Sequence, residues 1–131
     1  MKTSRASVFS DAEREYLGPG ERRLARVATV GADGMPHVVP TGWAYNAELD
    51  TVDLGGTDLT RTKKYRDVLR NPVIALVVDD VLPPWQPRGI EIRGLAEAIG
   101  GPEPVIRVRP RRIVSWGLDG DARSGRDVGA T

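Results

Sequence analysis

The sequence contains no cysteine, and His37 is the single histidine among its 131 residues. The absence of cysteine excludes disulfides, thiolate nucleophiles and thiolate metal sites. A single histidine excludes both a histidine-rich metal site and a mechanism that needs two imidazoles. We therefore expect no metal centre, and the side-chain inventory assigns no catalytic residue.

The sequence also lacks a charge excess and a long apolar run. Its 19 basic and 18 acidic residues give a net charge of +1, which favours neither nucleic acid nor a membrane surface as a partner. No apolar run approaches the length that spans a bilayer, and residues 1–10 lack the apolar core of a signal peptide. We expect a cytoplasmic protein that folds as a single domain over residues 1–118.

Two short helices are expected. Ser10 and Glu13 match a capping box, which predicts a helix that ends near Leu17. A second helix is expected over residues 60–70, where the apolar side chains of Tyr65, Val68 and Leu69 form one stripe toward the core.

Most of the remaining sequence is typical of short antiparallel strands separated by turns. The expected strands span residues 24–30, 36–46, 51–56, 73–78, 90–99 and 105–116. Because residues 73–78 are continuously apolar, we expect that strand to be covered on both faces. Residues 81–87 are rich in proline and predict a stiff loop, whereas the polar residues 119–131 predict a disordered tail. The pattern as a whole predicts a small mainly β fold, a six-stranded antiparallel barrel.

The residues between the third strand and the second helix have the character of an anion site. The strand ends at Gly55-Gly56, and a turn rich in Thr, Lys and Arg leads into the helix. Free backbone N–H groups and the positive end of the helix dipole favour an anion at this position. Lysines are disfavoured there unless an anion is bound, although a solvated helix start would also carry them. The pattern predicts a phosphate-binding turn.

Several segments resemble the flavin/deazaflavin oxidoreductase superfamily, which includes pyridoxamine 5′-phosphate oxidase. Residues 24–43, LARVATVGADGMPHVVPTGW, resemble its first hairpin, and residues 55–72, GGTDLTRTKKYRDVLRNP, resemble its phosphate-binding helix. The segments PPWQPRGIEIRGLAEA (83–98) and IRVRPRRIVSWG (106–117) resemble an actinobacterial subgroup that is regarded as dependent on coenzyme F-420, an 8-hydroxy-5-deazaflavin. The resemblance covers residues 9–118.

This resemblance implies a split β-barrel of the kind that binds FMN, assembled as a homodimer with its cofactor sites at the subunit interface. It places the cofactor phosphate against the second helix and the ring along the second strand. The residues at the phosphate are Thr60, Arg61, Thr62, Lys63 and Lys64. The residues beside the ring are Val39, Pro40, Thr41, Gly42, Gly55, Gly56 and Thr57, with Trp85 and Arg88 in a position to cover it from either subunit.

Two features of the sequence also fit interpretations other than a cofactor site. Residues 39–42 hold a proline and a glycine, which also mark an ordinary edge strand with a bulge. Arg107, Arg109 and Arg111 share one strand face, and they fit a solvent-exposed face, a dimer contact or the anionic tail of a deazaflavin.

The leading functional hypothesis is an oxidoreductase that transfers hydride between coenzyme F-420 and a small organic substrate, with FMN as the alternative cofactor. In such enzymes the cofactor supplies the reactive group, which suits a chain with no evident acid–base pair. Pyridoxamine phosphate oxidases carry a substrate-binding histidine near the C-terminus, and the lack of histidine after His37 argues against that activity. A dimeric carrier that binds the cofactor without turnover, and a purely structural dimer, are the alternatives from other classes.

Overall fold

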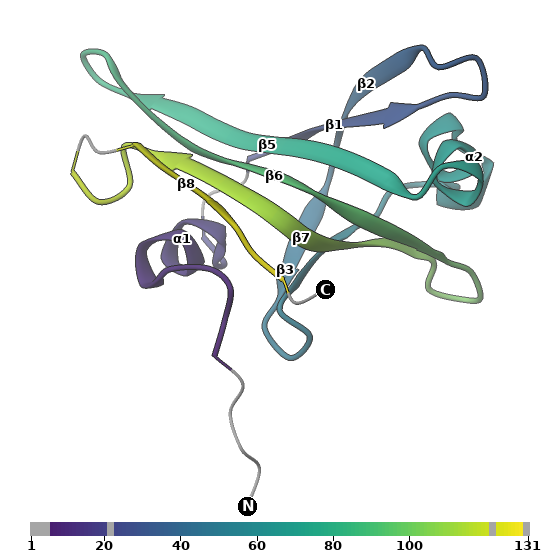
Figure 1. Ribbon diagram of the computed structural model, residues 1–131, viewed down its shortest axis with the longest axis horizontal. Coiled ribbons are helices and arrows are strands. Elements are labelled where there is room, and N and C mark those ends of the chain that lie inside the picture. Colours follow the sequence, from purple (N-terminus) through teal and green to yellow (C-terminus); the bar gives the residue numbers. More distant parts are fainter. Residues whose placement is uncertain (1–5, 21–22, 121–122, 130–131) are drawn as a thin grey trace, which may run out of the picture.

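The structure is a computed structural model that describes residues 6–20, 23–120 and 123–129. Its helices are α1 (Asp11–Leu17), the short 3-10 helix η1 (Leu59–Arg61) and α2 (Lys63–Arg70). Its strands are β1 (Ala25–Val30), β2 (Pro36–Thr41), β3 (Trp43–Asn46), β4 (Thr51–Leu54), β5 (Val73–Leu82), β6 (Gln86–Ile99), β7 (Val105–Trp116) and β8 (Arg123–Asp127). Figure 1 shows a strongly curved sheet with α1 beside β7 and β8 and with α2 at the far end, near β1.

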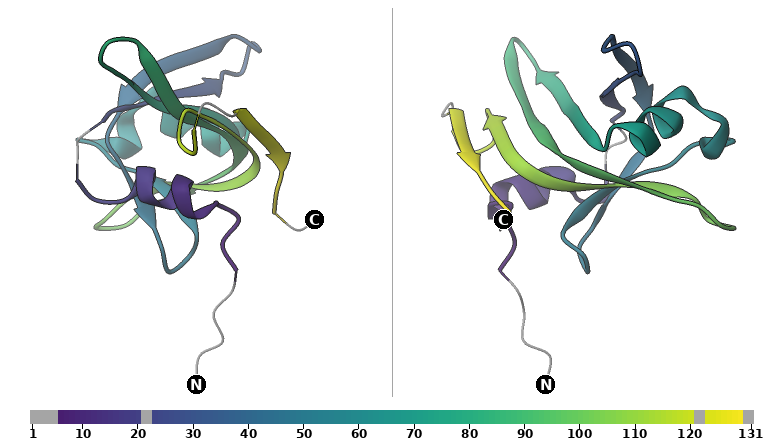
Figure 2. Two further views of the ribbon diagram at one scale, coloured as in Figure 1. Left: turned by 90° about the vertical axis from the view of Figure 1, so that its left-hand side faces the viewer. Right: turned by 45° about the vertical axis from the view of Figure 1, so that its right-hand side comes forward.

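The order of the strands explains the curvature. The sheet runs β2-β1-β5-β6-β7-β4-β3, and neighbouring strands are antiparallel. β2 and β3 stand at opposite ends of this order, yet Gly42 alone separates them in the chain. The sheet must therefore curl until its two ends approach each other, as the views in Figure 2 show. The prediction of a mainly β, antiparallel split barrel with two short helices is confirmed.

The core fills the concave side of the sheet. Every second side chain is buried along β1 and over residues 73–78 of β5, which is the alternation expected when one face of a sheet is packed. The fully buried side chains include Val27, Val52, Leu54, Leu76, Ile90, Ile92, Ile106, Val108 and Ile113. No helix in the described part of the chain is long and apolar enough to cross a membrane.

Three details of the predicted elements are wrong. Leu69 is 66% exposed on α2, because the burial of Tyr65 and Val68 turns it toward solvent. β5 is buried on one face only, and its outward Val73 is 42% exposed within this single chain. The predicted loop 81–87 is mostly strand, because β5 continues to Leu82 and pairs there with Gln86 of β6.

The number of strands also differs from six. The predicted strand 36–46 divides at Gly42 into β2 and β3, because the chain there passes from one end of the sheet to the other. The predicted disordered tail is also wrong, because residues 123–127 form β8, which pairs with residues 112–116 of β7. Residues 121–122 and 130–131 of that tail lie outside the described residues.

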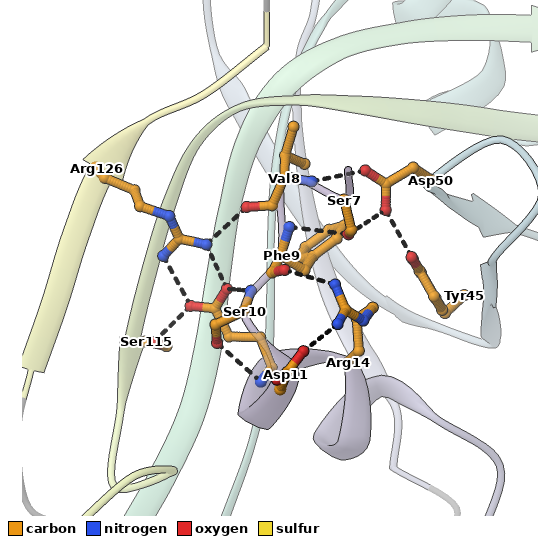
Figure 3. Close-up of polar contacts among 11 residues, drawn as sticks. Ser7, Val8, Phe9, Ser10, Asp11, Arg14, Tyr45, Asp50, Ser115 and Arg126 are labelled. Carbon is orange, nitrogen blue, oxygen red and sulfur yellow. Dashed lines mark hydrogen bonds and ion pairs between the residues drawn. The ribbon is translucent and has the colours of Figure 1, made fainter. Parts of the chain in front are cut away.

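A buried ion pair fastens β8 and the N-terminal helix together (Figure 3). The predicted capping box is present, since Ser10 Oγ accepts from the Glu13 N–H and the Glu13 carboxylate accepts from the Ser10 N–H. That carboxylate is 1% exposed and also accepts from Ser115 Oγ at 2.7 Å and from Arg126 at 2.6 and 3.0 Å. Arg126 further donates to the carbonyl of Val8. A polar C-terminal segment is thus ordered by one arginine that reaches into the N-terminal helix.

Replacing Arg126 by alanine should lower the free energy of unfolding substantially. The change leaves Glu13 as a buried carboxylate without its cation, and such losses are large. Because the Arg126 side chain is 33% exposed, we expect about 2–3 kcal/mol rather than the full penalty of a wholly buried pair. Urea denaturation followed by tryptophan fluorescence measures the difference.

Arg112 provides the matched control. It also bridges β7 and β8, to Asp127 at 2.9 Å, but the two side chains are 39% and 87% exposed, so Arg112→Ala should cost less than about 1 kcal/mol. Burial raises the pKa of Glu13, but the hydrogen bonds from Arg126, the Ser10 N–H and Ser115 outweigh it and hold the pKa below the ordinary value of 4.5. The Arg126 contribution should therefore be present above pH 4.5 and be lost as the pH falls through the lower folded-state pKa. Equal losses in the two variants would contradict this account.

Candidate functional site

The predicted phosphate turn lies between β4 and α2. Gly56 has φ 148° and Asp58 has φ 52°, so the chain turns sharply before η1. Thr62 caps α2: its Oγ1 accepts from the Tyr65 N–H at 3.3 Å and donates to the Leu59 carbonyl at 2.6 Å. The hydroxyl of Thr62 is thus already used to hold the turn, while Thr60 and Arg61 are exposed beside it.

The two lysines at this helix start have different surroundings. Lys63 Nζ donates to Asp67 at 3.1 Å, and Asp67 is buried and also accepts from Thr29 Oγ1 at 2.8 Å. Lys64 is half-buried, burial lowers its pKa, and no acidic partner for it is found in the described part of the chain. A partly desolvated cation at the positive end of a helix is stabilised by an added anion. Lys64 is therefore better suited than Lys63 to hold a phosphate.

Two hydrogen bonds join the predicted ring-binding residues Thr41 and Gly42 to Gly55, which follows β4. Thr41 Oγ1 donates to the Gly55 carbonyl at 3.0 Å, and the Gly55 N–H donates to the Gly42 carbonyl at 3.2 Å. A Cβ built on Gly42, Gly55 or Gly56 would meet no atom within 4 Å. The backbone of these glycines is therefore open to a ligand. Val39 and Pro40 precede them on β2, an edge strand whose pairing with β1 continues without a bulge from Ala25 to Val30.

Trp85 and Arg88 lie elsewhere in the chain. Trp85 is 75% exposed in the turn between β5 and β6. Figure 1 shows this hairpin at the opposite end of the sheet from α2. Arg88 donates to both oxygens of Asp80 at 2.8 and 3.0 Å, and its guanidinium lies 5.2 Å from the ring of Tyr16. That these two residues cover the cofactor ring from either subunit stays a prediction.

The structure also contains a charged cluster that the sequence did not indicate. Asp80 accepts from Arg88 and from Tyr16 Oη at 2.8 Å, and Arg23 lies 3.4 Å away from it. The hydrogen bonds from Arg88 lower the pKa of Asp80 to about 2, although burial opposes them. The cluster borders a hollow of about 260 Å³ between α1 and the end of β7. Its members lie far apart in the sequence, so no local pattern could have joined them.

Two arginines of the strand face on β7 have acidic neighbours within the chain. Arg107 makes a two-point ion pair with Asp53 at 3.1 Å, and Arg109 lies 3.5 Å from Glu97. His37 is half-buried near the start of β2. No group of three potential metal ligands is found among the described residues.

Comparison with known proteins supports this architecture. Residues 9–129 match the family model described as pyridoxamine 5′-phosphate oxidase. The chain is 42% identical to a 5a,11a-dehydrotetracycline/5a,11a-dehydrooxytetracycline reductase from Streptomyces rimosus, over 93% of this chain and 94% of that protein. This extent of similarity identifies the chain as an oxidoreductase that acts on a small organic molecule.

Solved structures share the fold at low sequence identity. A conserved hypothetical protein from Mycobacterium tuberculosis has a TM-score of 0.69, with 20% identity and 91% of each chain covered. An F-420 reductase has a TM-score of 0.58, with 24% identity, 76% of this chain and 94% of that chain covered. The fold, the family model and the reductase relative agree, and the chain belongs to the pyridoxamine 5′-phosphate oxidase family of split β-barrels.

Proposed function

We propose that this protein reduces an activated carbon–carbon double bond in a polycyclic organic acceptor, with coenzyme F-420 as the hydride donor. The observation that carries the proposal is the 42% identity, over nearly the whole of both chains, to a reductase of dehydrotetracyclines. The added hydrogen atoms correspond to one hydride from the reduced cofactor and one proton from solvent. No side chain is assigned as the proton donor.

The residues that would hold the cofactor divide into two groups. Arg61 and Lys64 offer cations beside the free N–H groups at the start of α2, which fits a phosphate. The open backbone of Gly42, Gly55 and Gly56 lies next to that turn and fits the polar edge of a flat ring. When bound there, the deazaflavin supplies the hydride, while the protein orients the two reactants and excludes water. Thr60, Thr62, Lys63, Thr57, Val39, Pro40 and Thr41 complete the proposed binding surface.

The choice of F-420 over FMN rests on the resemblance of residues 83–117 to the deazaflavin-dependent subgroup. Both cofactors carry a phosphate and a three-ring head, so the phosphate turn suits either. FMN is therefore the alternative cofactor. A carrier that binds without turnover is the alternative function.

A homodimer is the second part of the proposal, supported by an apolar strip on the outer face of the sheet. Val38 is 68% exposed, and its register partner is Ala28, which in turn pairs with Ala75 of β5. Val73 and Leu95, which are register partners on β5 and β6, are 42% and 39% exposed. Exposed apolar strips of this kind are typical of interfaces. A partner chain on this face would also cover the outward side of β5.

Turnover is tested anaerobically with reduced F-420 and 5a,11a-dehydrotetracycline, by following the absorbance of the oxidised deazaflavin. We expect saturable oxidation of the cofactor that is proportional to enzyme concentration, with pyridoxamine 5′-phosphate unreactive as the control. Tight binding of the cofactor with no oxidation would favour the carrier instead. Faster turnover with reduced FMN would move the protein to the flavin-dependent branch.

The dimer is tested by the mass in solution, measured by light scattering. Wild type should have twice the chain mass of 14.2 kDa. Val38→Glu places a charge in the apolar strip and should shift the protein toward the monomer. Leu49→Glu, at a 43% exposed leucine in the turn between β3 and β4, should leave the mass unchanged. A monomeric wild type would refute the proposed dimer.

A further inference from the structure

A cleft of about 750 Å³ opens between the end of α1 and the edge strand β3. This volume lies within the range of about 300–1,000 Å³ that is typical of sites for drug-sized ligands. Residues Leu17, Gly18, Pro19, Gly20, Arg23, Leu24, Gly42, Trp43, Ala44, Tyr45 and Ala47 line it. Among these described residues the only charged side chain is Arg23, so the lining is largely apolar.

The two aromatic side chains of the cleft are fixed by hydrogen bonds at their polar ends. Trp43 Nε1 donates to the Arg23 carbonyl at 2.7 Å. Tyr45 Oη donates to Asp50 at 2.6 Å, and Asp50 also accepts from Ser7 Oγ and the Val8 N–H, as Figure 3 shows. Burial and the bond to Asp50 raise the pKa of Tyr45, so the phenol stays neutral near pH 7. With their polar atoms satisfied, both rings offer rigid apolar surfaces to a ligand.

The cleft also contains an exposed aliphatic side chain, that of Leu24. Leu24 precedes β1 and is 54% exposed, although the strand that follows begins with the fully buried Ala25. Ala44 also borders the cleft, although on β3 its side chain alternates with those of Trp43 and Tyr45 and projects from the opposite face of the strand. A flat ring system that enters the cleft would remove Leu24 from water.

One end of the cleft reaches the proposed cofactor site. Gly42 lines the cleft, and its carbonyl accepts from the Gly55 N–H in the open backbone surface that we assign to the cofactor ring. At the cleft wall Arg23 is held by Asp80, 3.4 Å away, and by the ring of Tyr16, 4.2 Å away. A ligand in the cleft would thus lie beside the ring surface and present its oxygens to a positioned guanidinium.

We infer that this cleft is the acceptor site, and that it takes a planar, fused-ring molecule with an oxygen-bearing edge directed toward Arg23. Its role as the reducing site rests on the proposed function, whereas the binding of such a molecule does not. A fused-ring acceptor would fill more of the cleft volume of about 750 Å³ than a single-ring enone would.

The test is equilibrium dialysis of tetracycline against the cofactor-free protein and against its Leu24→Gln variant. Leu24→Gln replaces apolar contact by a polar side chain and should weaken tetracycline binding about tenfold, given the apolar area that the change removes from contact. Leu24 is exposed, so the fold should be retained, which urea denaturation checks.

Leu49→Gln is the matched control, because Leu49 has similar exposure at 43% but does not line the cleft. It should bind tetracycline like wild type. F-420 affinity should be the same in all three proteins. Wild type that fails to bind tetracycline, or a Leu24→Gln variant that binds it as tightly as wild type, would overturn the inference. If F-420 does not bind but tetracycline does and Leu24→Gln weakens it, the proposed function fails while the assignment of the cleft stands.

Discussion

Gly42, the single residue between β2 and β3, determines how strongly the sheet is curved. Because Gly42 alone connects the two ends of the sheet, the sheet must curl, and β2 and β3 lie close without pairing with each other. At this open seam between β2 and β3 the Gly55 N–H donates to the Gly42 carbonyl, and the backbone of Gly42, Gly55 and Gly56 is open on its other side. The proposed cofactor surface lies at this seam, and the cleft beside β3 extends it. A fully closed barrel would have no such surface.

The two ends of the chain stabilise this open barrel from outside. α1 contributes a buried carboxylate, β8 contributes the arginine that neutralises it, and Ser115 of β7 joins them. The same N-terminal segment holds Asp50, which fixes Tyr45 in the wall of the cleft. The packing of the termini therefore also determines the shape of the proposed acceptor site. In a small domain with a modest core, a few buried polar contacts of this kind are a large share of the stability.

Much of the fold could be predicted from the sequence, because its signals are local. The Ser10–Glu13 capping box, the glycine turns and the alternating strands are readable from residues close together in the chain. β8 was missed since residues 123–127 carry no apolar pattern, and their order depends on Arg126 reaching Glu13, 113 residues away. The Tyr16–Asp80–Arg88 cluster and the cleft are likewise formed by residues far apart in the sequence, so local sequence patterns could not predict them. The sequence predicted a turn rich in Thr, Lys and Arg before α2, and its binding of phosphate stays a prediction; the difference between Lys63, which is paired with Asp67, and Lys64 was not predicted.

The central claim is that the turn between β4 and α2 holds the phosphate of a deazaflavin. Calorimetric titration of wild type and Lys64→Ala with oxidised F-420, and separately with FMN, tests it most directly. The account predicts that F-420 binds wild type more tightly than FMN does, and that Lys64→Ala loses about 1.5–3 kcal/mol of binding free energy, as expected for a charge-assisted contact. Equal affinity of wild type and Lys64→Ala for F-420, or no binding of either cofactor, would contradict it.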